Sequence, residues 1–119
     1  MKDFRDLKVW SKSHNITLKI YQATRAFPQE ETYGLKSQMR RASVSVPTNI
    51  AEGCGRNSDA ELARFLEIAM GSASELEYLV ILSKDLKFVD IKCYNSLSAE
   101  ITEIKRMLAT LIRKLRAEC

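Results

Sequence analysis

The scarcity of helix-breaking residues is the feature that most restricts what this chain can fold into. Only two prolines and four glycines occur among its 119 residues, so we expect long regular elements joined by few turns. In four segments apolar residues recur at spacings of three and four, which is the periodicity of an amphipathic helix. The sequence therefore predicts an all-α protein with helices over about 6–26, 34–54, 59–86 and 91–116.

The connections between these predicted helices are short, which makes antiparallel packing of neighbours the natural arrangement. The length is that of one ordinary domain. We therefore expect residues 1–119 to form a single up-down-up-down four-helix bundle. Its core should be built from the periodic apolar positions, which include Val9, Ile16, Ile20, Leu35, Met39, Val46, Ile50, Leu62, Leu66, Leu76, Val80, Leu97, Ile101, Ile104 and Leu108.

Polar residues mark the expected helix starts. Asp6 and Asp90 precede the first and last helices and are candidate N-caps. Ser58 followed by Glu61 has the spacing of a capping box, in which each side chain bonds the backbone N–H of the other residue. These signals predict where three of the four helices begin.

Pro47 lies inside the second predicted helix and is unusual there. Proline cannot donate to the carbonyl four residues earlier, that of Ser43, and its ring crowds that carbonyl. We expect a bend near Pro47, with the hydroxyls of Ser43, Ser45 and Thr48 satisfying loosened backbone groups. The glycines of the Gly53–Gly55 segment should end this helix in the left-handed conformation that glycine tolerates.

The second and third predicted helices are more apolar than one bundle core requires. A helix in a lone bundle needs one buried stripe, yet these two carry apolar residues beyond it. The surplus predicts a second buried surface and hence a homo-oligomer; a wide core stripe with scattered surface residues is the alternative. The candidate interface residues are Val44, Pro47, Ala51, Phe65, Ile68 and Leu79.

The charge pattern permits a nucleic-acid or acidic protein partner. The net charge is +4 and the pI is about 9.1. Residues 57–96 hold seven acids and four bases, whereas residues 32–56 hold one acid and four bases. A basic stripe on the last helix could follow a phosphate backbone or could be a solvated face near a helix C-terminus. The arginines of the second helix could bind phosphate or bridge to acids of the third helix. The candidate nucleic-acid-binding residues are Lys36, Arg40, Arg41, Lys105, Arg106, Arg113 and Arg116.

Residues suited to catalysis or metal binding are sparse. His14 is the one histidine and lies on an apolar stripe, so we expect it to be packed in the core or to lie at its rim and not to be catalytic. No phosphate-binding loop or metal-ligand spacing occurs, and we predict no catalytic residue, cofactor or metal.

The cysteines predict a cytoplasmic protein with free thiols. They are odd in number and widely spaced: Cys54, Cys93 and Cys119. No stretch is apolar enough for a membrane span.

Several segments together resemble the 23S rRNA intervening-sequence protein family, which is also called the four helix bundle protein family. The opening matches at Leu7–Trp10. The central signature matches from Phe27 to Leu35, from Gln38 to Ala42, from Ser45 to Pro47, from Asn49 to Gly53, and at Arg56. Further matches run through the third and fourth helices and end at Ile112. The resemblance covers essentially the whole chain.

The resemblance implies an antiparallel four-helix bundle and a homopentamer. Some family members are encoded within intervening sequences of bacterial 23S rRNA genes, and the related accessory variability determinants of diversity-generating retroelements engage nucleic acid and a reverse transcriptase. The resemblance therefore implies self-association and a structured RNA or DNA partner. It also suggests a reverse transcriptase as a protein partner. We expect a non-enzymatic accessory protein that binds nucleic acid through basic faces; the alternative is an oligomeric protein scaffold without nucleic-acid binding.

Overall fold

The computed structural model describes residues 3–117. Within that range the chain is helical and contains no strand, which confirms the predicted all-α fold. The predicted boundaries of the second, third and fourth helices agree with the structure to within one residue, and the first helix starts and ends two residues inside its predicted range. The elements are η1 (Phe4–Asp6), α1 (Lys8–Thr24), η2 (Gln29–Glu31), α2 (Leu35–Cys54), α3 (Asp59–Asp85) and α4 (Ile91–Ala117).

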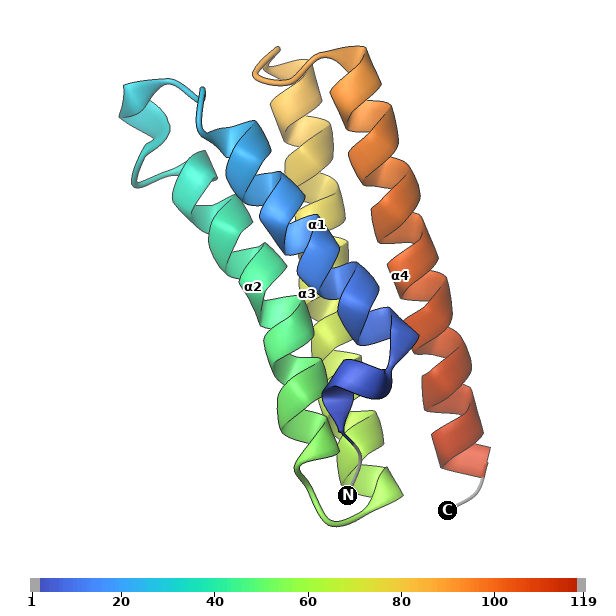
Figure 1. The fold of residues 1–119 in the computed structure, drawn as a ribbon. Coiled ribbons are helices and arrows are strands. Elements are labelled where there is room, and N and C mark those ends of the chain that lie inside the picture. The colour runs from blue at the N-terminus through green and yellow to red at the C-terminus, as the bar shows by residue number, and fades with distance from the viewer. Residues whose placement is uncertain (1–2, 118–119) are drawn as a thin grey trace.

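The four α-helices form an up-down-up-down bundle, as predicted. Each helix packs against its neighbour in sequence, and α1 closes the ring against α4. Figure 1 shows the start of α1 and the end of α4 at one end of the bundle, together with the turn between α2 and α3. The molecule measures 46 × 23 × 20 Å. With 17 residues, α1 is much shorter than α3 and α4, which have 27 each, so it covers only part of its neighbours.

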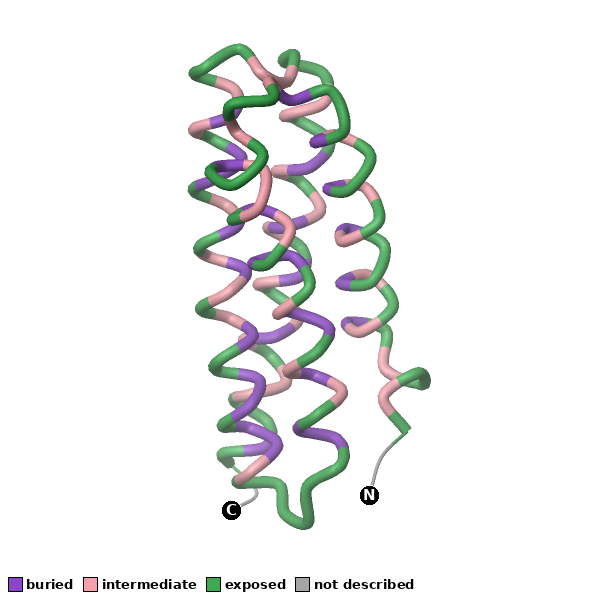
Figure 2. Tube along the Cα trace, turned by 90° about the vertical axis from the view of Figure 1, so that its left-hand side faces the viewer, coloured by how far each residue is buried: buried purple, intermediate pink, exposed green. Residues whose placement is uncertain are grey.

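One apolar core runs between the helices. The positions that the periodicity selected are buried, and Figure 2 shows buried residues along the inward side of each helix. The most deeply buried large side chains include Ile16, Ile20, Met39, Ile50, Leu66, Leu76, Ile101, Ile104 and Leu108. Such burial is the main stabilising contribution in a bundle of this size.

Two of the three predicted N-caps are confirmed. The Ser58 hydroxyl accepts from the backbone N–H of Glu61 at 3.1 Å, and the Asp90 carboxylate accepts from the N–H of Cys93 at 2.7 Å. Asp6 is not an N-cap, because a short η1 precedes α1 and includes this residue. The second half of the capping box is also wrong, because the Glu61 carboxylate binds Arg64 at 3.1 Å instead of reaching back.

Gly53 has a packing role and not the predicted conformational one. No glycine in residues 3–117 has a positive φ, and α2 ends with Gly55 at φ −82°. A Cβ on Gly53 would lie 2.8 Å from Cβ of Phe65 and 2.9 Å from Cδ1 of Leu62. Glycine is needed here because α3 approaches the α2 backbone too closely for any side chain.

The left-handed residue is instead a lysine at the end of α3. Lys87 has φ 64°, and the N–H groups of Lys87 and Phe88 bond the carbonyls of Lys84 and Ser83, both at 2.9 Å. This bond pair is the Schellman arrangement that ends many helices, with lysine where glycine is usual. It reverses the chain into α4.

Pro47 is accommodated by a neighbouring helix. α2 continues through Pro47 without a break, and the predicted bend remains a prediction. The Ser43 carbonyl, which Pro47 cannot pair, accepts a hydrogen bond from the Thr17 hydroxyl of α1 at 2.8 Å. The predicted donors Ser43, Ser45 and Thr48 do not supply it, because the first two hydroxyls have other partners and Thr48 is exposed. The compensation is therefore tertiary and not local.

Candidate nucleic-acid interface

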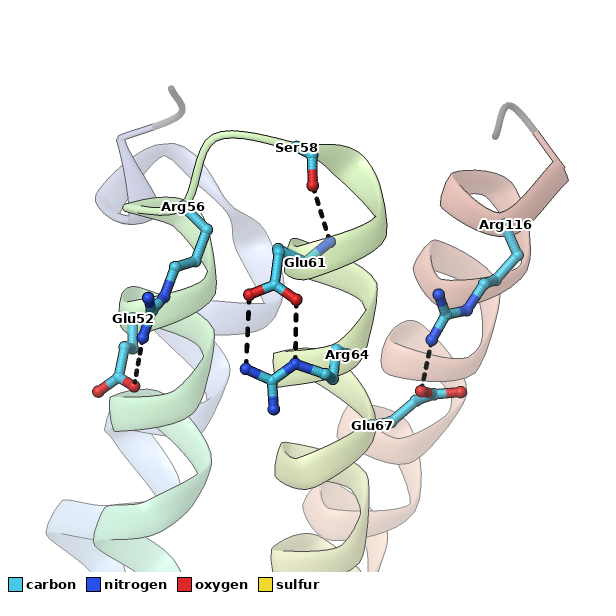
Figure 3. Close-up of polar contacts among 7 residues, drawn as sticks. All are labelled: Glu52, Arg56, Ser58, Glu61, Arg64, Glu67 and Arg116. Atoms are coloured by element: carbon cyan, nitrogen blue, oxygen red, sulfur yellow. Dashed lines mark hydrogen bonds and ion pairs between the residues drawn. The ribbon is translucent and has the colours of Figure 1, made fainter.

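The basic stripe predicted on α4 divides into two parts. Lys105 and Arg116 reach sideways to α3, where Lys105 Nζ lies 2.9 Å from Glu77 and Arg116 Nη2 lies 2.6 Å from Glu67. Figure 3 shows the Arg116–Glu67 pair bridging the two helices near the end of the bundle. These two cations already have carboxylate partners on α3, so they are less available to a polyanion than an unpaired arginine would be.

Arg106 and Arg113 form the other part of the stripe. Both are exposed, and neither lies within ion-pairing distance of a carboxylate in the described part of the chain. Arg113 makes one long contact, 3.5 Å from its Nη2 to Oγ1 of Thr110. Because they are seven residues apart, the two arginines lie on the same side of α4. They are the members of the stripe best placed to meet phosphate groups.

Arg40 has a structural position that neither sequence interpretation anticipated. Its Nε donates to Oγ1 of the buried Thr24 at 2.9 Å, and its Nη2 donates to the carbonyl of Tyr21 at 3.1 Å. The guanidinium also lies 4.4 Å from the centroid of the Tyr21 ring. The last carbonyls of a helix lack intrahelical partners, so Arg40 of α2 serves as a side-chain cap for the end of α1.

Arg41 and Lys36 remain available for contact with a nucleic acid. Arg41 is exposed and lines a shallow polar groove between α2 and α3, beside Ser72 and Glu75. Lys36 is half-buried. Across residues 3–117, neither has a carboxylate within 4.0 Å. The sequence pair Arg40-Arg41 is thus split into one structural arginine and one outward arginine.

The acidic residues of α4 face the opposite neighbour from its paired bases. Glu103 pairs with Lys12 of α1 at 2.9 Å, and Glu100 pairs with Lys19. The sequence analysis did not predict these two ion pairs. The spacing of seven residues between the lysines does place them on one side of α1. Partly exposed pairs of this kind contribute about 0–1 kcal/mol each, and both link α1 to α4.

A second arginine cluster lies where α2 turns into α3. Figure 3 shows Arg56 beside Glu52 and Arg64 beside Glu61. The two guanidinium groups lie 4.8 and 4.6 Å from the centroid of the Phe65 ring. The hydrogen bond from Arg64 lowers the pKa of Glu61 below its usual value. The sequence interpretation did not select these arginines, and each of them forms an ion pair with a nearby carboxylate.

The residues predicted to form the oligomer interface differ in how far they are buried. Phe65, Leu79 and Pro47 are buried within the chain itself, so the wide apolar stripes largely serve the core. Val44 and Ile68 are 38% and 42% exposed. Ala51 is half-buried on a groove between α1 and α2. The oligomer interface remains a prediction, and Val44 and Ile68 are its two most exposed members.

The described residues offer little for catalysis or metal binding. Between residues 3 and 117 there is no group of three or more His, Cys, Asp or Glu side chains that could hold a metal ion. The exposed His14 ring stacks on Trp10, with 5.2 Å between ring centroids. Cys93 is a half-buried free thiol whose pKa is raised by burial and by Asp90. Cys54 is buried, and Cys119 lies outside the described residues.

None of the described helices combines the length and the apolar character needed to cross a bilayer.

Comparison with known proteins identifies the family. Residues 5–110 match the sequence model of the 23S rRNA-intervening sequence proteins. The chain belongs to this family. A crystal structure of a protein of unknown function from the S23 ribosomal protein family of Bacteroides thetaiotaomicron is similar, with a TM-score of 0.79 and 26% identity over 87% of this chain and 97% of that one. The comparison with curated proteins gives no match. Family membership therefore agrees with the fold and with the resemblance seen in the sequence. The similar crystal structure is of a protein of unknown function.

Proposed function

We propose that this chain is a non-enzymatic, homo-oligomeric accessory protein of the cytoplasm that binds structured RNA or DNA through the outward side of α4. The observation that carries the proposal is the pair Arg106 and Arg113, two exposed arginines on one side of a helix without a carboxylate partner in residues 3–117. The family description, which names a 23S rRNA intervening sequence, points to RNA as the first partner to test.

Self-association would strengthen such binding. A net charge of +4 per chain is modest, but a ring of subunits, for which we propose five, would repeat the two arginines around its surface. Exposed Val44 and Ile68 offer apolar surface for subunit contact. Many weak phosphate contacts from one assembly act together through their high effective concentration.

The expected binding is largely independent of sequence. Contacts from arginine to phosphate release counterions, so affinity should fall steeply with salt. Base recognition in single strands usually requires aromatic side chains on which bases stack. None of the positions around Arg106 and Arg113 in α4, from Thr102 to Ala117, is aromatic. The geometry therefore favours reading of backbone and shape over reading of bases.

A protein-only scaffold is the second candidate. It is favoured by the positions of Arg40, Lys105 and Arg116, which are engaged in contacts within the chain. On this proposal a protein partner, such as a reverse transcriptase, would bind a surface of the oligomer, and nucleic acid would not.

A fluorescence anisotropy titration separates the two candidates. Labelled structured RNA and duplex DNA are titrated with the protein at low and moderate salt. We expect binding that weakens with salt and is largely lost in the Arg106→Glu/Arg113→Glu variant. The control is Arg64→Glu, an equal change per site at an arginine already paired with Glu61. Absence of binding at low salt, with the oligomer intact by light scattering, would favour the scaffold.

A further inference from the structure

A groove is open between the beginning of α1 and the later part of α4. It forms because η1 turns toward α2 and does not contact α4, as the path of the chain before α1 in Figure 1 shows. α4 continues to Ala117, so its last turns have no helix beside them on this side. The groove is lined by Leu7, Lys8, Val9, Arg106, Met107, Thr110 and Leu111.

The floor of this groove is apolar. Val9 is buried, while Leu7, Met107 and Leu111 are partly exposed and pack against the core. On α4, Met107 and Leu111 are four residues apart and lie on one side of the helix. This side continues the seam that α1 covers farther along the bundle. The open end therefore has the apolar surface that a further helix would cover.

The charge along this seam reverses at the groove. In the covered part, α4 presents Glu100 and Glu103 to lysines of α1. In the open part it presents Arg106, and Lys8 lies on the opposite wall. Within residues 3–117 neither cation has a carboxylate partner. A segment with acidic residues would therefore complement the charge of this part of the seam.

We propose that this groove binds an amphipathic helix of a partner protein, with leucine-like residues on one side and carboxylates along its edges. The apolar side would cover Met107 and Leu111, and the carboxylates would pair with Lys8 and Arg106. Helices bind hydrophobic grooves in this way through residues three and four apart. Nucleic acid fits less well, because its sugar–phosphate backbone offers little apolar surface to the floor of the groove and none of the lining residues is aromatic.

The test uses two labelled synthetic helical peptides of the same length. The first has leucine on one side and glutamate elsewhere; the second has lysine in place of every glutamate. Anisotropy titrations at moderate salt should show binding of the acidic peptide only. Amide chemical shifts should change around Leu7, Met107 and Leu111. Equal binding of the two peptides, or shifts centred elsewhere, would overturn the proposal.

Three variants make the test specific to the groove. Arg106→Glu and Met107→Gln should each weaken the acidic peptide by about tenfold or more, which corresponds to roughly 1.4 kcal/mol. Arg113→Glu makes the same charge change outside the groove and should alter affinity by less than about twofold. The Arg106→Glu variant should in turn gain affinity for the lysine peptide. Equal losses from Arg113→Glu and Arg106→Glu would mean diffuse attraction and no specific groove.

Competing occupants give different results. If a second copy of the chain fills the groove, shifts at Met107 and Leu111 will appear on dilution without any peptide. If RNA fills the apolar floor of the groove, Met107→Gln will weaken RNA binding as much as it weakens peptide binding. Either outcome would overturn the proposal. Failure of peptide binding leaves RNA binding through Arg106 and Arg113 untouched, so the two proposals are tested separately.

Discussion

Arg40 and Arg41 are neighbours in the sequence with different surroundings in the structure. Arg40 caps the end of α1 through Thr24 and Tyr21, whereas Arg41 is exposed. A guanidinium that donates to a partly buried acceptor such as the Thr24 hydroxyl contributes to stability, and its removal takes that hydrogen bond away. An exposed arginine without such contacts contributes little to stability.

The two arginines should therefore differ under the same substitution. We expect Arg40→Met to lower the free energy of unfolding by about 1–2 kcal/mol, since it removes two hydrogen bonds to α1. Arg41→Met should change it by less than about 0.5 kcal/mol. Urea denaturation followed by circular dichroism measures both. Equal effects of the two substitutions would show that the cap does not stabilise α1.

At the scale of elements, α1 and α2 depend on one another through Pro47. The proline removes the usual donor for the Ser43 carbonyl, and the Thr17 hydroxyl of α1 replaces it at 2.8 Å. A valine at position 17 would keep the size of the side chain and remove the donor. An alanine at position 47 would restore the backbone N–H.

A double-mutant cycle tests this pairing. We expect Thr17→Val to cost about 1–3 kcal/mol when Pro47 is present and less in the Pro47→Ala background, with a coupling energy of about 1 kcal/mol. The second hydrogen bond of Thr17, to the Ser13 carbonyl, is lost in both backgrounds and cancels. Chemical denaturation of the four proteins gives the coupling. A coupling near zero would mean that Thr17 does not compensate for the proline.

At the scale of the whole molecule, we predict self-association. Light scattering at micromolar concentration should give a mass several times that of the 13.6 kDa chain. Ile68→Glu should reduce that mass, because it would bury an unpaired charge in a subunit contact, while the monomer fold stays intact since Ile68 is 42% exposed. Ile91→Glu is the matched control, an equal change at a residue that is 62% exposed at the start of α4. A monomeric wild-type protein, or an unchanged mass for Ile68→Glu, would contradict the expected interface.

The sequence by itself determined the helices, their order and most of the core. Periodic apolar residues such as Ile16, Met39 and Leu108 are buried as predicted, because helical periodicity and burial have the same physical origin. Ser58 and Asp90 cap helices as predicted, since capping depends only on residues within one turn. Features that local chemistry decides can be predicted from local sequence.

The tertiary structure alone decided which charged residues are paired within the chain and which remain available to a partner. The spacing on α4 placed Lys105, Arg106, Arg113 and Arg116 in one stripe, but Glu77 and Glu67 of α3 engage two of them. Likewise Gly53 is required by the approach of α3, and Arg40 by the end of α1. These outcomes depend on residues far apart in the sequence, whose distance and orientation are fixed only when the helices pack. Periodicity gives the direction of a side chain from its own helix axis and does not identify the neighbour it meets.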